Sequence, residues 1–216
     1  AGCYEALEMW PREVWPGLMG FVDRTGKPGP QTWENGSFLA KMADHPVVGI
    51  CWHEAIAYSR WVGKRLATAA EWQKASGGPE HSSGAQVNRY PWGGFYAEGK
   101  ANLWSASLGQ TAPVQAFREG STLNGIHQMT GNVWEWLGDP LETIPGHPSE
   151  IFRPVKPMRR IIGGAYNTYL PAEATNQYVT GQAELDRRPN IGFRCAVSTD
   201  RLRPAVALAR TDSLPD

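Results

Sequence analysis

Cysteine is scarce in this chain, and no long apolar run is present. The three cysteines, Cys3, Cys51 and Cys195, are widely spaced and include no CxxC pair, so they predict neither a zinc site nor a disulfide framework. One bridge and three free thiols are both compatible with this count, which leaves the cellular compartment open. No apolar stretch approaches the roughly 20 residues that a membrane-spanning helix needs.

An excess of charge of one sign is also missing. The 21 basic and 21 acidic side chains give a formal net charge of zero, and no block of Lys and Arg stands out. Nucleic-acid-binding proteins usually carry a concentrated basic patch. We therefore expect no nucleic acid among the partners of the chain and no membrane span within it.

Sustained hydrophobic periodicity is rare, whereas Gly (24), Pro (17) and Trp (10) are abundant among the 216 residues. This composition predicts many turns and little regular structure. Long ordered loops need stabilisation of their own, and large indole side chains can supply it. The seven tryptophans between residues 52 and 136 are therefore interpreted mainly as core, with a ligand-stacking surface as the alternative.

Residues 45–76 carry the clearest signals of secondary structure. Residues 45–50 have the pattern of a short buried strand, and a helix should follow and end at Gly63. The apolar face of that helix is formed by Ala55, Tyr58, Trp61 and Val62. Thr68 is the expected N-cap of a second helix, and Glu71 completes a capping box with it.

The other expected elements are short. Four apolar side chains at helical spacing predict a short helix within residues 4–15, and residues 16–30 should form a loop. The stretch 171–189 begins with a helical pattern and continues as a polar loop, and residues 199–216 have the composition of a tail. Short strands are expected at residues 131–137, 160–167 and 192–197.

A series of short motifs follows in a fixed order between residues 45 and 198. They are HPVV at 45–48, KRLATAAEW at 64–72, YPWG at 90–93, ANLW at 101–104, APV at 112–114, GNVWEW at 131–136, GGAY at 163–166 and GFRCA at 192–196. This series resembles the formylglycine-generating enzyme, or sulfatase-modifying factor, domain family. The resemblance implies an α+β fold, a variant of the C-type lectin fold with two short helices, short strands and long ordered loops. It also implies a domain over residues 45–198, preceded by an irregular part, 1–44.

Two positions in this series bear on the family's chemistry. The oxygen-dependent enzymes that the chain resembles hold copper(I) with two cysteine thiolates, five residues apart, just after the GGxY motif. Thr168 and Glu173 stand at these positions here, and neither supplies the soft thiolate that suits this metal. We therefore expect no copper and no formylglycine generation.

A second catalytic branch of the family uses iron, held largely by histidines from a separate domain. The histidines of this chain show no two-His, one-carboxylate spacing. They are His45, His53, His81, His127 and His147. A metal-dependent oxidase or protein-maturation enzyme, with these histidines, Cys51 and Cys195 as its candidates, is the catalytic alternative.

The start of the domain also departs from the family's pattern. Family members begin with strands that carry an FxMG segment, to which Leu18-Met19-Gly20 corresponds poorly. The first strands are therefore expected to be missing from residues 1–44. Because an open sheet edge favours association, a protein partner that supplies these strands is one hypothesis, and a longer chain is the other.

A calcium site is implied by the resemblance at Gln128, Gly131, Val133 and Glu135. Backbone carbonyls and a carboxylate are hard oxygen ligands of the kind that Ca²⁺ prefers, and Gln128 stands where Asn or Asp is usual. The alternative interpretation makes Glu135 a buried, hydrogen-bonded strand residue.

The segment 166–184 forms the ligand or substrate face in the proteins that the chain resembles. Its Tyr, Asn and Thr side chains combine rigid aromatic area with adaptable hydrogen bonding, which suits recognition. The candidate ligand-binding residues are Tyr166, Asn167, Thr168, Tyr169, Asn176, Gln177 and Tyr178. The leading hypothesis is a ligand-binding or accessory module, and a structural subunit of a larger complex is the non-enzymatic alternative. The resemblance favours an extracytoplasmic location.

Overall fold

The computed structural model describes residues 2–77, 88–141 and 156–201. Two α-helices occur in these ranges, α1 (Trp52–Trp61) and α2 (Ala69–Ala75). The remaining helical turns are short 3-10 segments. They are η1 (Gly2–Tyr4), η2 (Leu7–Met9), η3 (Arg12–Gly20), η4 (Ala40–Met42), η5 (Trp104–Ala106), η6 (Arg118–Gly120), η8 (Pro171–Ala174) and η9 (Thr199–Arg201). No helix in the described ranges is long and apolar enough to cross a membrane.

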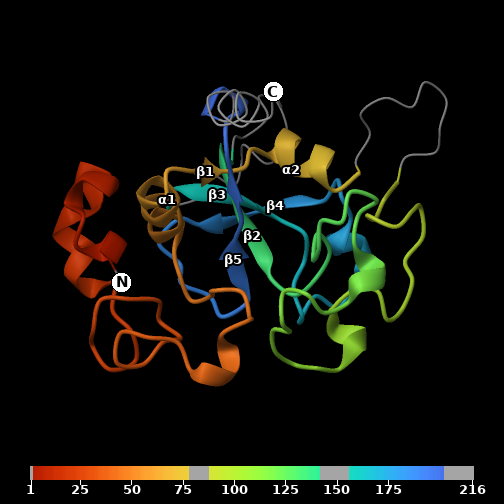
Figure 1. The fold of residues 1–216 in the computed structure, drawn as a ribbon, viewed down its shortest axis with the longest axis horizontal. Coiled ribbons are helices and arrows are strands. Elements are labelled where there is room, and N and C mark those ends of the chain that lie inside the picture. The colour runs from red at the N-terminus through yellow and green to blue at the C-terminus, as the bar shows by residue number, and fades with distance from the viewer. Residues whose placement is uncertain (1, 78–87, 142–155, 202–216) are drawn as a thin grey trace, which may run out of the picture.

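A four-stranded sheet lies at the centre of the molecule (Figure 1). Its strands are β2 (Trp134–Pro140), β3 (Met158–Ile162), β4 (Val179–Ala183) and β5 (Ile191–Phe193). The order is β4-β3-β2-β5, with β5 parallel to β2 and the other two pairings antiparallel. A small second sheet joins β1 (Arg65–Leu66) to β6 (Cys195–Ala196). This mixture of few helices, short strands and long loops confirms the expected α+β fold.

Both α-helices were predicted correctly. The cap of α2 shows why this helix begins at Ala69, and α1 is held by its packing. In α2 the Thr68 hydroxyl accepts from the Glu71 N–H at 3.2 Å, while the Glu71 carboxylate accepts from the Thr68 N–H at 2.9 Å, which is the predicted capping box. In α1 the buried Trp52 and Ala55 pack against strand residues of the central sheet. The Trp52 indole also donates to the Leu137 carbonyl at 2.8 Å.

The expected strand at residues 45–50 is wrong. Gly49 has φ +72°, a left-handed conformation that interrupts an extended strand. Its N–H donates to the Arg188 carbonyl and its own carbonyl accepts from the Gln31 N–H. The segment is buried at residues 48–50, but two loops satisfy its backbone groups in place of a strand partner.

Three further expectations need correction. Residues 4–15 form 3-10 turns and no α-helix, because Pro11 and Pro16 lack the N–H groups that a continuous helix requires. The predicted strand 160–167 ends at residue 162, since Gly163 and Gly164 turn the chain with φ +97° and +75°. Residues 179–183, expected to be loop, form β4. Of the predicted tail, 199–216, the structure describes only residues 199–201, which form η9. The rest lies outside the described residues.

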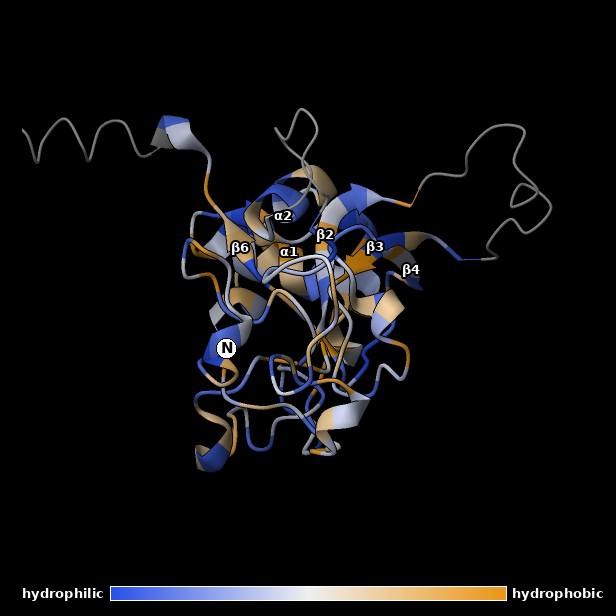
Figure 2. Cartoon of the chain, turned by 90° about the vertical axis from the view of Figure 1, so that its right-hand side faces the viewer, coloured by the Kyte–Doolittle hydropathy of each residue, from blue (hydrophilic) through white to orange (hydrophobic). Residues whose placement is uncertain are grey.

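Regular elements and long loops occupy different halves of the molecule (Figure 2). The N-terminal turns lie beside α1 in Figure 1, and Arg187 attaches them there. Its guanidinium donates to Glu54 in α1 and to the carbonyls of Val22 and Gly29 in the N-terminal part. Tyr4 adds a hydrogen bond from its hydroxyl to Glu54. Residues 2–30 are thus tied to the helix by these hydrogen bonds, and Trp10, Val14 and Phe21 also pack with Cys51 and Ala57 in a buried apolar cluster.

Candidate ligand-binding site

The segment predicted to bind a ligand, residues 166–184, contains both accessible and buried candidates. Asn167, Tyr169 and Tyr178 are exposed, and Tyr166 and Gln177 are half-buried. These five side chains are available to a ligand. The Asn190 amide also donates to the Asn167 side-chain oxygen at 3.0 Å.

Two candidates, Thr168 and Asn176, are buried and hold the loops in place. The Thr168 hydroxyl accepts from the Ala165 N–H at 2.9 Å. The Asn176 amide donates to the carbonyls of Ser76 and Asn88, both at 3.2 Å. Asn176 Oδ1 is buried and has no hydrogen-bond partner. The structure therefore gives these two side chains a positioning role beneath the accessible surface.

The exposed Trp104 and the half-buried Trp134 extend the accessible surface beyond the predicted segment. The Trp104 ring meets the Tyr169 ring edge-on at a centroid distance of 6.5 Å, with the two side chains 58% and 73% exposed. Trp134 contacts Tyr178 at 6.2 Å. The interpretation of the tryptophans as core holds for the fully buried Trp72, but it is wrong for Trp104. No spacing signal distinguishes the two, because both occur in family motifs.

Thr168 and Glu173, which the motif resemblance aligns with the copper-binding cysteines, both make backbone contacts within the loops. Besides its hydroxyl contact, Thr168 accepts the Trp104 N–H on its carbonyl at 3.2 Å, which fixes η5 against the turn after β3. Glu173 lies in η8 and donates its N–H to the Leu170 carbonyl at 3.0 Å. A hydroxyl and a carboxylate thus stand where thiolates would be needed to bind copper(I).

The three cysteines are free. Cys3 and Cys51 are buried, and Cys195 in β6 is half-buried. Burial raises the pKa of each thiol above its usual value. The thiolate is the form that binds metals and attacks substrates, so this environment disfavours such roles at neutral pH.

Two of the predicted calcium residues, Gln128 and Glu135, contact the guanidinium group of Arg194. Arg194 donates from Nε and Nη2 to the two Glu135 oxygens, both at 2.6 Å, and from Nη2 to the Gln128 carbonyl at 3.3 Å. Trp72 donates to the same carboxylate at 2.6 Å. The Gln128 side-chain oxygen is buried and unpaired, which would suit a cation. The only carboxylate of the set, that of Glu135, is already paired with Arg194, however. The four predicted residues, Gln128, Gly131, Val133 and Glu135, therefore do not fit Ca²⁺ in this arrangement.

The histidines in the described ranges lie in separate contacts. His53 Nε2 is 3.3 Å from a Glu184 oxygen, and burial lowers the His53 pKa. His45 contacts the Thr111 hydroxyl, and His127 contacts that of Ser121. Across the described ranges no three His, Cys, Asp or Glu side chains are grouped so that they could hold a metal ion. His81 and His147 lie outside these ranges.

Residues 15–199 match the sulfatase-modifying factor enzyme 1-like domain. Because this match covers most of the chain, the chain belongs to that family, as its motifs predict. Its fold is shared with solved structures of low sequence identity. PvdO from Pseudomonas aeruginosa aligns with 78% of this chain and 66% of its own at TM-score 0.52 and 22% identity. Treponema denticola variable protein 1 aligns with 86% and 81% at TM-score 0.53 and 18% identity.

Curated relatives include both catalytic and inactive proteins. A hercynine oxygenase of Mycobacterium tuberculosis is 35% identical over 67% of this chain and 35% of its own length. A formylglycine-generating enzyme of Streptomyces coelicolor is 32% identical over 73% and 54%. The mouse protein named inactive C-alpha-formylglycine-generating enzyme 2 is 28% identical over 77% and 53%. The chain therefore spans about a third to a half of the length of these relatives.

Proposed function

We propose that this member of the family has no copper chemistry and acts as a ligand-binding or accessory module. The supporting observation is the placement of Thr168. The residue that stands at a copper-binding position is a buried threonine whose hydroxyl and carbonyl both accept backbone N–H groups. The surface beside it is formed by exposed aromatic and amide side chains, which suit recognition better than bond breaking.

Metal content tests the chemical half of this proposal. Elemental mass spectrometry on natively purified protein should find copper and iron well below one equivalent. Calcium should also be substoichiometric, and added Ca²⁺ should leave the thermal midpoint unchanged, since a ligand that binds only the folded state would raise it. One equivalent of copper together with oxygen-dependent oxidation of a thiol peptide would overturn the proposal.

Binding measurements test the recognition half. We would probe an array of defined oligosaccharides and peptides with the protein and with the double variant Tyr169→Ser, Tyr178→Ser. Hits that depend on this surface should weaken by at least about tenfold in the variant, because exposed aromatic rings supply much of the contact energy in such surfaces. Met19→Ser removes an exposed apolar side chain from η3 and is the control. Equal loss in both variants would contradict the proposed surface.

An enzyme of different chemistry is the second candidate, and the hercynine oxygenase relative favours it. Iron near one equivalent in the metal measurement would support this candidate. A structural subunit is the third, because β5 is an edge strand that pairs only with β2 in the described sheet. A stable complex with one dedicated partner, isolated at fixed stoichiometry, would favour that reading.

A further inference from the structure

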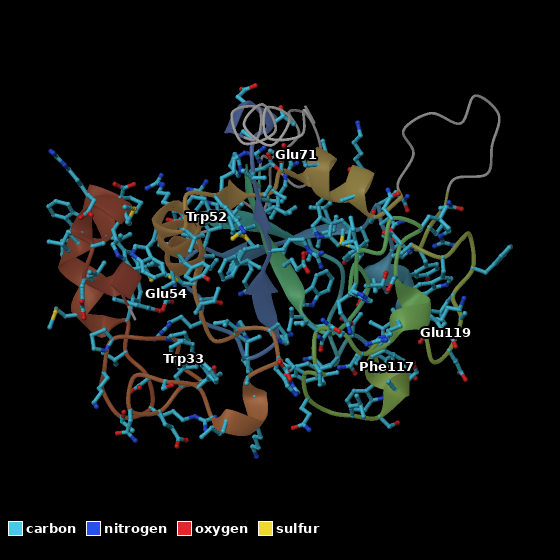
Figure 3. The ribbon with its side chains drawn as sticks, viewed as in Figure 1. Trp33, Trp52, Glu54, Glu71, Phe117 and Glu119 are labelled. Carbon is cyan, nitrogen blue, oxygen red and sulfur yellow. The ribbon has the colours of Figure 1, made fainter. Side chains whose placement is uncertain are left out.

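A cavity of about 720 Å³ lies between the N-terminal loops, α1 and the end of the central sheet. This volume is typical of sites for small organic molecules. The walls come from residues far apart in the sequence, and many of them are aromatic. The aromatic lining includes Trp33, Phe38, Tyr58, Trp61, Tyr166 and Phe193. Figure 3 labels Trp33 in the N-terminal loop and Glu54 in α1, two lining residues from different parts of the chain.

Hydrogen bonds fix the N-terminal wall of the cavity. Asp23 accepts from the N–H groups of Thr25, Lys27 and Gly36, which closes residues 23–36 into a compact loop. The Thr32 hydroxyl donates to the Val48 carbonyl at 2.8 Å and joins this loop to the opposite segment. The cavity wall is therefore held in place without a ligand, which lowers the ordering cost of binding.

The charges around the cavity leave one cation without a partner. The Glu54 carboxylate is neutralised by Arg187, and Arg24 pairs with Glu34 at 3.2 Å. Lys41, also a lining residue, has no carboxylate within ion-pairing distance in the described part of the chain. An apolar cavity with a single unpaired ammonium group is complementary to a molecule with an apolar body and one negative charge.

We propose that this cavity is a binding site for a small organic anion, a carboxylate or sulfonate with an aromatic body. The aromatic walls take up the body, and the Lys41 ammonium group attracts the anionic group. Tyr169 and Tyr178, the aromatic residues of the proposed recognition surface, do not line this cavity, and only Tyr166 belongs to both sites. Binding at one site can therefore fail without loss of binding at the other. It requires no metal and no covalent step.

Isothermal titration calorimetry with a matched pair of probes tests the site. Naphthalene-1-acetate and the neutral naphthalene-1-acetamide have the same aromatic body. The acetate should bind about tenfold more tightly, the factor that one charge-assisted contact supplies. Lys41→Gln should remove this preference and leave the affinity for the amide unchanged. Lys156→Gln, which removes an exposed lysine outside the cavity, should change neither affinity.

A variant that fills the cavity separates this site from other apolar surfaces. Val47 is a partly exposed lining residue, and Val47→Trp should abolish binding of both probes while the thermal midpoint stays within a few degrees. Tyr169→Ser with Tyr178→Ser should leave both affinities intact. Absence of binding to the original chain, equal affinity for the two probes, or undiminished binding to Val47→Trp would each overturn the proposal.

Discussion

At the scale of single residues, two ion pairs with similar geometry should contribute very differently to stability. Glu54 and Arg187 are 2.8 Å apart with side chains 2% and 12% exposed. Arg65 and Glu71 are 2.6 Å apart with side chains 39% and 44% exposed. A buried charge that loses its partner stays desolvated, whereas an exposed charge is solvated by water instead. Exposure, and not distance, therefore decides the cost of breaking each pair.

Glu54→Gln should lower the free energy of unfolding by about 3–5 kcal/mol, because Arg187 would remain buried without its counter-charge. Arg65→Gln, the control at the exposed pair, should cost about 1 kcal/mol or less. Urea denaturation followed by tryptophan fluorescence measures both values. Similar costs for the two variants would show that the Glu54 pair is hydrated in solution.

Asp23 should make the stability of the protein depend on pH. Burial alone would raise its pKa, but hydrogen bonds from Gly36, Thr25 and Lys27 outweigh burial and lower the pKa from 3.8 to about 2. A carboxyl group whose pKa is lower in the folded state stabilises the fold above pH 3.8, and this contribution is lost as the pH falls towards about 2.

The Asp23→Asn variant isolates this contribution. Its thermal midpoint should lie a few degrees below that of the original chain at pH 6, and the difference should shrink between about pH 4 and pH 2. Asp44→Asn, which removes an exposed carboxylate, is the control. A difference that stays constant with pH would contradict the assigned role of the Asp23 hydrogen bonds.

At the scale of elements, the turn Gly163–Gly164 brings η8 against the end of β3. Gly164 has φ +75°, and a Cβ there would lie 2.5 Å from the Ala174 Cβ. Gly125 has nearly the same φ, +76°, but no atom lies within 4 Å of its Cβ position. These two glycines separate the cost of the backbone conformation from the cost of close packing.

Gly164→Ala should be less stable than Gly125→Ala by about 1–3 kcal/mol, the usual cost of overpacking. Both variants carry the strain of a left-handed alanine, so the difference reports the clash with Ala174. Urea denaturation gives the two free energies. Equal destabilisation of the two variants would mean that η8 moves aside freely.

Local signals predict an element only where its own residues decide its structure. Thr68 and Glu71 define α2 because both halves of the cap lie within four residues. Residues 45–50 have the apolar pattern of a strand, but their hydrogen-bond partners, Gln31 and Arg188, are distant in sequence. The half-buried β4 is a strand because β3 pairs with it residue by residue, and no period within VTGQA indicates this.

The candidate site shows the same limit. Family motifs locate the 166–184 segment and the replacements at Thr168 and Glu173, because those features depend on residue identity and order. Which side chains reach solvent depends on packing between distant segments. Thr168 is buried beneath the Trp104 backbone, and Asn176 is buried against Ser76. Neither contact has a signal in the sequence, nor does the cavity, whose walls join at least four separate segments.

At the scale of the whole molecule, the three thiols report on different parts of one fold. Cys3 lies in the N-terminal turns, Cys51 caps α1 and Cys195 lies in β6. The N-terminal turns are attached by the apolar cluster that includes Trp10 and Phe21 and by Tyr4 and Arg187, which both bind the buried Glu54. Regions with few attachments open locally at lower free energy than the global unfolding reaction. Loss of Glu54 should therefore release the N-terminal turns before it unfolds the rest.

Iodoacetamide labelling at pH 8, followed by peptide mass spectrometry, measures this order of opening. In the original chain all three thiols should react slowly, because burial limits access and raises each pKa. Glu54→Gln should accelerate the reaction of Cys3 at least about tenfold more than that of Cys195, a difference in opening free energy of about 1.4 kcal/mol. If both thiols accelerate by the same factor, the N-terminal turns unfold with the central sheet, and the cavity between them is then as stable as the protein itself.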